Sequence, residues 1–192
     1  MSVRPILTAA CLAAAVLAAP AAAATLVVGN TQGRSCYEAA KRLERGGAAG
    51  SADFAVCTDA LENEALSIRN RSATFVNRGI LHMSRGDYAP AYRDYSEAVR
   101  LRPNLGEAQI NMGAALIGLS RMQEGIAAID RGLQLGSKEP EKAYFNRALA
   151  LERAGDFTGA YRDFQRALEL RPQWELPMKE LARYQVRRRG DG

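Results

Sequence analysis

The sequence predicts an all-α protein built from stacked helical hairpins, and three observations support this prediction. A stretch of about 34 residues recurs along the chain. Within each copy, apolar side chains recur at three- and four-residue steps, which places them on one face of a helix. Glycine and proline stand between the predicted helices, where they interrupt helical structure. The composition agrees, since 192 residues that are 47% hydrophobic and 24% charged suit one soluble domain with a core.

The repeat is clearest from the asparagines. Asn77 recurs as Asn111 after 34 residues and as Asn146 after a further 35. Two copies also share their turn, because Gly86-Asp87 corresponds to Gly155-Asp156. The other aligned positions carry small or aromatic side chains: Gly79, Gly113 and Ala148; Ala91, Gly125 and Ala160; Tyr95, Ile129 and Phe164; Ala98, Gly132 and Ala167.

This period and these residues resemble the tetratricopeptide repeat (TPR) family. The resemblance implies a TPR-type α-solenoid of stacked helix hairpins with a C-terminal capping helix. Together with an N-terminal export signal, it divides the chain as follows: 1–24 signal peptide, 25–34 flexible N-terminal segment, 35–71 degenerate first repeat, 72–105, 106–140 and 141–174 repeats, and 175–192 capping helix and basic tail.

The first 24 residues are typical of an export signal. Arg4 gives the N-terminal region a positive charge, and the apolar stretch Ile6–Leu17 is too short to span a bilayer. The alanines up to Ala24 fit a cleavage site. The alternative is a lipoprotein that is acylated at Cys11. Cleavage removes Arg4 and no acidic residue, so the formal charge falls from +5 to +4. We expect a periplasmic or secreted bacterial protein with no membrane span.

Two cysteines, Cys36 and Cys57, remain after removal of the signal. An even pair in an exported chain predicts a disulfide, and the alternative is two buried reduced thiols. The bridge would join the two helices of the degenerate repeat and add ~3 kcal/mol of stability. Such a bridge suits an end repeat, which contacts only one neighbour and frays easily.

The helices follow in order. Ser35 fits an N-cap for a first helix that extends to about residue 45, after an extended or mobile segment over 25–34. A second helix is predicted over 53–63. The next hairpin has helices over 72–85 and 88–101, and Pro103 ends it.

The later helices are less uniform. Glycines replace two alanines at Gly125 and Gly132, and each costs ~1 kcal/mol relative to alanine in a helix, so this helix is predicted to be the least stable. Residues 141–172 form the best copy. A last helix over 174–189 would cover the exposed face of the final repeat. The basic tail from 187 is predicted to fray, and the alternative is contact with an acidic surface.

Catalysis has little support in the sequence. His82 is the only histidine, and it aligns with Leu116 and Leu151, which favours a packing role. No nucleophile motif, phosphate-binding glycine loop or cluster of metal ligands is present, and the two cysteines are not in a Cys-x-x-Cys arrangement. We therefore expect no enzyme, cofactor, metal or small-molecule substrate. The mild positive charge, without a basic–aromatic cluster, does not indicate nucleic-acid binding.

The resemblance to the TPR family implies recognition on the concave face, which the first helix of each repeat lines. The residues that align with this face are the candidate peptide-binding set. They are Val76, Asn77, Ile80, Met83, Ile110, Asn111, Ala114, Ile117, Lys142, Phe145, Asn146 and Leu149.

This set predicts an apolar strip beside a row of amides. An asparagine amide can donate one hydrogen bond and accept another, which suits an extended backbone. TPR domains that hold a C-terminal carboxylate use lysines and an arginine beside such asparagines. Here Val76 and Ile80 stand at two of those positions, Lys142 is the one basic match, and Asn146 replaces the arginine. An apolar strand or amphipathic helix is therefore the favoured ligand.

The sequence as a whole predicts a non-enzymatic TPR scaffold or adaptor that binds a protein or peptide partner in the periplasm. The alternative is a structural protein of the cell envelope that associates with itself, as a homodimer, or covers its own groove. An exposed apolar surface usually indicates a partner, which can be a second copy of the same chain.

Overall fold

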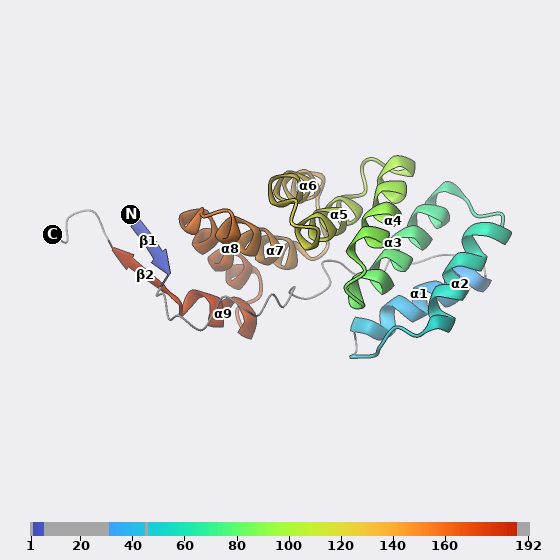
Figure 1. Cartoon of the computed structure of the whole chain (residues 1–192), viewed down its shortest axis with the longest axis horizontal. Coiled ribbons are helices and arrows are strands. Elements are labelled where there is room, and N and C mark those ends of the chain that lie inside the picture. Colours follow the sequence, from blue (N-terminus) through green and yellow to red (C-terminus); the bar gives the residue numbers. More distant parts are fainter. Residues whose placement is uncertain (1, 6–30, 45, 188–192) are drawn as a thin grey trace. The chain divides into compact units, whose positions relative to one another are not determined.

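The computed structural model describes residues 2–5, 31–44 and 46–187 (Figure 1). Residues 6–24 of the predicted signal, the segment 25–30 and the tail 188–192 lie outside the described residues. Within the described part the helices are α1 (Thr31–Glu44), α2 (Ser51–Asn63), α3 (Ile68–Ser84), α4 (Tyr88–Leu101), α5 (Gly106–Gly118), α6 (Met122–Leu135), α7 (Pro140–Arg153), α8 (Phe157–Leu170) and α9 (Glu175–Leu181). The strands are β1 (Ser2–Pro5) and β2 (Tyr184–Arg187).

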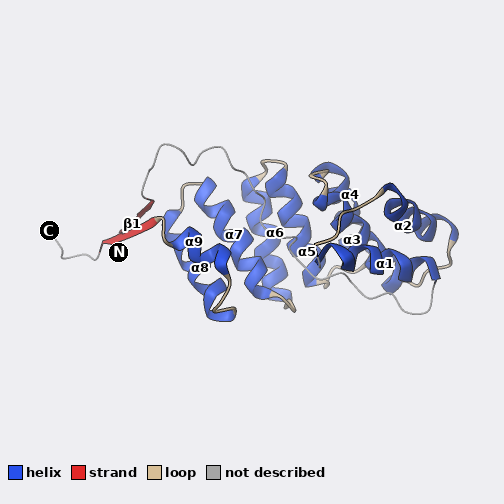
Figure 2. Ribbon diagram, turned by 90° about the horizontal axis from the view of Figure 1, so that it is seen from below, coloured by secondary structure: helices blue, strands red, loops and turns tan. Residues whose placement is uncertain are grey.

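These elements form two compact units. The N-terminal unit contains three hairpins, α1/α2, α3/α4 and α5/α6, and successive hairpins pack through α1 on α3 and α4 on α5. The C-terminal unit contains the α7/α8 hairpin, α9, and the antiparallel pair of β1 and β2. The all-α, hairpin-based fold class predicted from the repeat is therefore confirmed (Figure 2). None of the described helices is long and apolar enough to cross a membrane.

The first helix starts earlier than predicted. We expected an N-cap at Ser35, but α1 already begins at Thr31. Glu64, which follows α2, explains the difference: its carboxylate accepts hydrogen bonds from the backbone N–H groups of Gln32 (2.9 Å) and Gly33 (3.3 Å). The first N–H groups of a helix have no partner within the helix, so a distant carboxylate can cap it as well as a local serine.

The next hairpin also begins earlier than the repeat alignment indicated. α3 starts at Ile68 rather than Ser72, because the Ser67 hydroxyl accepts a hydrogen bond from the backbone N–H of Asn70 and so caps the helix. The following helix, α4, has the predicted bounds.

Small residues set the spacing within the hairpins. A Cβ at Gly79 would lie 2.5 Å from the ring of Tyr95, so the glycine makes room for this buried aromatic. In the α5/α6 hairpin the backbones themselves approach, because a Cβ at Gly113 would lie 2.7 Å from the carbonyl oxygen of Gly125.

The C-terminal helix is shorter than predicted. We expected a helix over 174–189, but α9 ends at Leu181 and the chain then forms β2. The pairing partner is β1, in an antiparallel register that sets Val3 opposite Val186. The sequence near the C-terminus gave no sign of this strand, because its partner lies about 180 residues away, at the other end of the chain.

Candidate functional site

The predicted face of α3 is buried in the N-terminal unit. Val76 and Asn77 are 0% exposed and Ile80 is 2% exposed. The two apolar residues belong to a core cluster that includes Ala40 of α1 and Ala108 of α5, so neighbouring hairpins cover them. The prediction that they form an open apolar strip is therefore wrong, and of the α3 set only Met83 remains partly exposed.

The α5 residues of the predicted strip are also core residues. Ile110 packs on Gly132 and Ile117 packs on Gly125, because a Cβ at either glycine would lie within 2.7 Å of the facing isoleucine Cγ1. Both isoleucines and the adjacent Ala114 are buried. The glycines of α6 allow this close packing, which the alignment of first helices alone did not reveal.

In the C-terminal unit, the two apolar candidates pack in the core, whereas Lys142 is paired with an acidic residue. Phe145 is buried, with its ring 5.6 Å from that of Phe164 and 4.9 Å from that of Trp174, so it is an aromatic core residue. Leu149 packs partly buried against the same cluster. Lys142 forms an ion pair with Glu139 at 2.6 Å and is not a free cation for a carboxylate ligand.

The three asparagines are buried as well. Asn77 is 0%, Asn111 2% and Asn146 6% exposed. Within the described residues, the Nδ2 atoms of Asn111 and Asn146 are enclosed and have no hydrogen-bond partner. An enclosed amide donor without a partner costs ~1–3 kcal/mol. These two amides are therefore the strongest indication of an unmet binding interaction in the predicted set.

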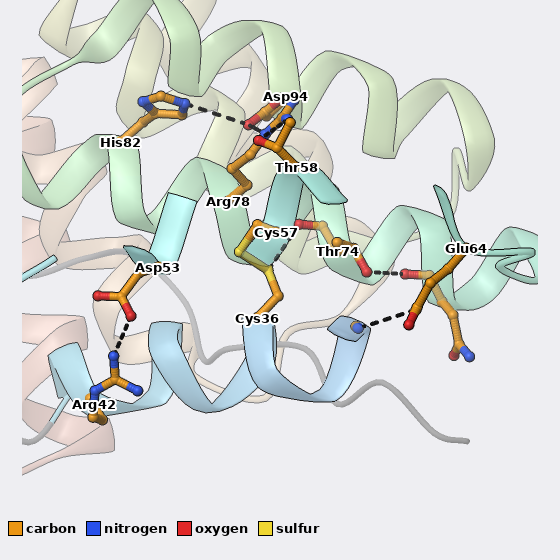
Figure 3. The surroundings of a disulfide bond; sticks show 12 residues. Cys36, Arg42, Asp53, Cys57, Thr58, Glu64, Thr74, Arg78, His82 and Asp94 are labelled. Atoms are coloured by element: carbon orange, nitrogen blue, oxygen red, sulfur yellow. Dashed lines mark hydrogen bonds and ion pairs between the residues drawn. A yellow bond between two sulfur atoms is a disulfide. The ribbon is translucent and has the colours of Figure 1, made fainter. Parts of the chain in front are cut away.

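The predicted disulfide is present between Cys36 of α1 and Cys57 of α2 (Figure 3). The two Cα atoms are 4.7 Å apart, and both cysteines are fully buried against Leu81 of α3. A second contact joins the same helices, since Arg42 forms an ion pair with Asp53. The bridge thus fixes the terminal hairpin where it packs on α3.

A charged cluster beside the disulfide was missed by the sequence analysis. Arg78 of α3 forms two hydrogen bonds with Asp94 of α4, at 2.9 Å from Nε and 2.7 Å from Nη2 (Figure 3). Its Nη1 also donates to the Thr58 hydroxyl of α2 at 3.0 Å. The guanidinium therefore joins three helices, and the Asp94 side chain is only 7% exposed. The hydrogen bond to Asp94 is the main cause of a raised Arg78 pKa.

The same pair recurs in the C-terminal unit. Arg147 of α7 binds Asp163 of α8 through two hydrogen bonds of 2.6 and 2.8 Å. Both members are 69 residues beyond those of the first pair, so the repeat register could have revealed them. The repeat between them has Met112 and Ala128 at these positions and cannot form the pair.

His82 lies beside the first pair. Its ring packs against that of Phe54 of α2, with centroids 4.7 Å apart and the planes tilted by 51°. Its nitrogens lie 3.8 Å from Asp87 and 3.9 Å from Asp94, beyond hydrogen-bond distance. Burial lowers the pKa of His82, Asp94 opposes this shift, and Arg78 adds to it. The expected packing role agrees with this position. No group of three or more candidate ligands in the described residues could hold a metal ion.

The described part of the chain defines a protein of stacked helical hairpins. Comparison with known proteins identifies the class further, because residues 141–173 match the tetratricopeptide repeat. Curated protein sequences yield no match.

Three solved structures illustrate the similarity. An Arabidopsis OM64 TPR domain is 24% identical, with a TM-score of 0.58, and the match covers 61% of this chain and 96% of that one. The first TPR of Spaghetti (RPAP3), solved with the HSP90 peptide SRMEEVD, is 22% identical, with a TM-score of 0.54 and coverage of 58% and 89%. MamA from Desulfovibrio magneticus RS-1 is 18% identical, with a TM-score of 0.62 and coverage of 79% and 82%. This chain has the fold of the TPR proteins.

Proposed function

We propose that this protein is a non-enzymatic TPR scaffold that is exported to the periplasm and binds an apolar peptide segment or partner helix. The partner binds along the first helices of the hairpins in the N-terminal unit, where Asn77 and Asn111 lie. The fold supports the general role, since a TPR domain of similar structure was solved with a bound peptide. The export signal predicted over 1–24 supports the location.

The observation that carries the proposal is the enclosed amide nitrogen of Asn111 on α5, which has no hydrogen-bond partner among the described residues; the same holds for Asn146 of α7. A backbone carbonyl of a bound segment would supply the missing acceptor and recover the cost of the buried donor. Both amides are enclosed in the chain as it stands, so binding must uncover them. The partly exposed Met83 would then contact an apolar side chain of a segment bound to the N-terminal unit.

Site-specific photo-crosslinking in envelope extract tests this function. A photoreactive residue at Met83, which is partly exposed on α3, should capture a distinct protein. The matched control is Arg93, an exposed residue of α4 on the second helix of the same hairpin, where we expect no such adduct. An Asn111→Ala substitution should weaken the Met83 adduct. The same adducts from both positions would contradict the proposal.

A self-covered structural protein is the second candidate, and one observation favours it. Most of the predicted face, including Val76, Asn77 and Ile110, is almost completely buried in the 192-residue chain. This candidate predicts adducts within one chain or between identical chains. Light scattering at high protein concentration separates adducts within one chain from adducts between identical chains, because a monomer would exclude self-association.

A further inference from the structure

The sheet formed by β1 and β2 places residues 2–5 beside residues 184–187 (Figure 1). The strands are antiparallel, and Val3 is opposite Val186. Val3 is only 5% exposed and belongs to the same core cluster as Phe145, Trp174 and Tyr184. β1 therefore supplies two things to the C-terminal unit: backbone pairing for β2 and an aliphatic side chain for the aromatic cluster.

Strand β2 is also held in place by contacts that do not involve β1. The Tyr184 hydroxyl donates to Glu152 of α7 at 3.0 Å, and the Tyr184 ring lies 5.8 Å from that of Tyr161 and 6.2 Å from that of Phe164. Arg183 adds an ion pair with Glu152 at 3.2 Å. These contacts fix the start of β2 on α7 and α8, so they can hold it in place when β1 is absent.

β1 lies within the segment that export is expected to remove. Cleavage near Ala24 would leave β2 as an edge strand with unpaired backbone groups and would vacate the position of Val3 beside Trp174. An edge strand next to a vacant apolar position is a surface that accepts an extended segment, through backbone hydrogen bonds and one side chain in the pocket.

We propose that β2 of the exported protein is an acceptor for an extended segment of a partner protein, which binds antiparallel with an aliphatic side chain in the position of Val3. β1 occupies this site until the signal is removed. A second copy of the exported chain fits less well, because β2 pairing with β2 leaves the position of Val3 empty while each Tyr184 is engaged with Glu152. The inference rests on the export step of the proposed function, and it uses a site that does not involve the asparagines.

The fluorescence of Trp174, the only tryptophan of the chain, reports occupancy of this site. In the full chain, a Val3→Asp substitution should displace β1, because a carboxylate cannot be buried in the aromatic cluster without a partner. We expect the Trp174 emission to shift to longer wavelength and its quenching by acrylamide to increase. Met178→Asp is the control, because Met178 lies on α9 of the same unit but is 51% exposed, and it should leave the emission unchanged.

A synthetic peptide of residues 1–8 is then titrated into the Val3→Asp chain. Saturable recovery of Trp174 protection, absent for the same peptide with aspartate in place of valine, supports the proposal. Unchanged emission in Val3→Asp, or no recovery with the peptide, overturns it. Dimerisation of the Val3→Asp chain with Trp174 protected in the dimer also overturns it, since a second copy is then the occupant.

Failure of this inference can be separated from failure of the proposed function. Mass determination of the protein isolated from the periplasmic fraction shows whether residues 1–24 are removed. A mature protein that retains them overturns the inference, because β1 still occupies the site. The crosslinking result at Met83 is independent of this outcome, since Met83 lies in the N-terminal unit.

Discussion

Two buried aspartates, Asp94 and Asp163, each accept two hydrogen bonds from one arginine of the same hairpin. We predict that Arg78→Met lowers the free energy of unfolding by about 2–3 kcal/mol, because it leaves the Asp94 carboxylate buried without its main partner. Urea denaturation of the full chain measures this difference.

The chain itself offers the matched control. The repeat between the two pairs has Met112 and Ala128 in place of the arginine and aspartate. The double variant Arg78→Met/Asp94→Ala should therefore be more stable than Arg78→Met alone, since no unpaired charge remains buried. Equal stability of the two variants would show that the unpaired carboxylate is not the cause of the loss.

His82 makes the stability depend on pH. Burial lowers its pKa in the folded chain below the ordinary value of about 6.5, so the unfolded chain binds the proton more readily. Its contribution to stability is fully present above that value and is lost as pH falls towards the folded pKa. Urea midpoints at a series of pH values between 5 and 8 should therefore fall on the acid side (about 6.5 and below).

Leucine at the same position of other repeats supplies the control for His82. His82→Leu copies Leu116 and Leu151 and should reduce the loss of stability below about pH 6.5. The carboxylates of Asp87 and Asp94 and the guanidinium of Arg78 are unchanged in this variant. An identical pH profile for both proteins would assign the effect to another group.

The sequence predicted the roles of some residues correctly and those of others incorrectly. The disulfide of Cys36 and Cys57 was predicted from their even number and from the predicted export of the chain, and the structure confirms the disulfide. The burial of the apolar face of α3 could not be predicted in this way. Alignment shows which residues share a helix position, but it does not show that Ala40 and Ala108 cover Val76. The tertiary arrangement of the hairpins decides that burial.

Among the elements, α1 and α2 depend most on one covalent bond. Replacing both Cys36 and Cys57 with alanine should lower stability by about 3 kcal/mol, since the bridge closes a loop with a sequence separation of 21. Hydrogen–deuterium exchange should show the loss as faster exchange in α1 and α2. Exchange that rises equally in α8 would contradict a local role for the bridge.

The α5/α6 hairpin depends on glycine in a different way. Gly132→Ala should destabilise the chain by about 1–3 kcal/mol, although alanine favours a helix by ~1 kcal/mol. The new Cβ would lie 2.5 Å from Ile110 Cγ1 and 2.7 Å from the carbonyl oxygen of Gly106. Thermal denaturation measures the effect, and a higher melting temperature would contradict it.

Element bounds show what the sequence could not specify. Helices within the repeats, such as α4, matched the prediction, because period and turn residues define them locally. The start of α1 and the end of α9 differed, since Glu64 and β1 act on them from distant positions in the chain. Contacts of this kind leave no local pattern to recognise.

At the scale of the whole molecule, the repeat predicted the fold class, and the structural similarity to TPR proteins confirms it. The same repeat did not reveal the division into two units or the strand pair at the end of one of them. Partner binding by the first helices remains the central claim, because it is the step that connects this fold with a function.

Hydrogen–deuterium exchange of the full chain, alone and with the protein captured at Met83, tests that claim most directly. The proposed function predicts slower backbone exchange in the bound state in α3 and α5, the first helices of their hairpins, with little change in α4 and α6. Slower exchange confined to α4 and α6, or none in any helix, would contradict it.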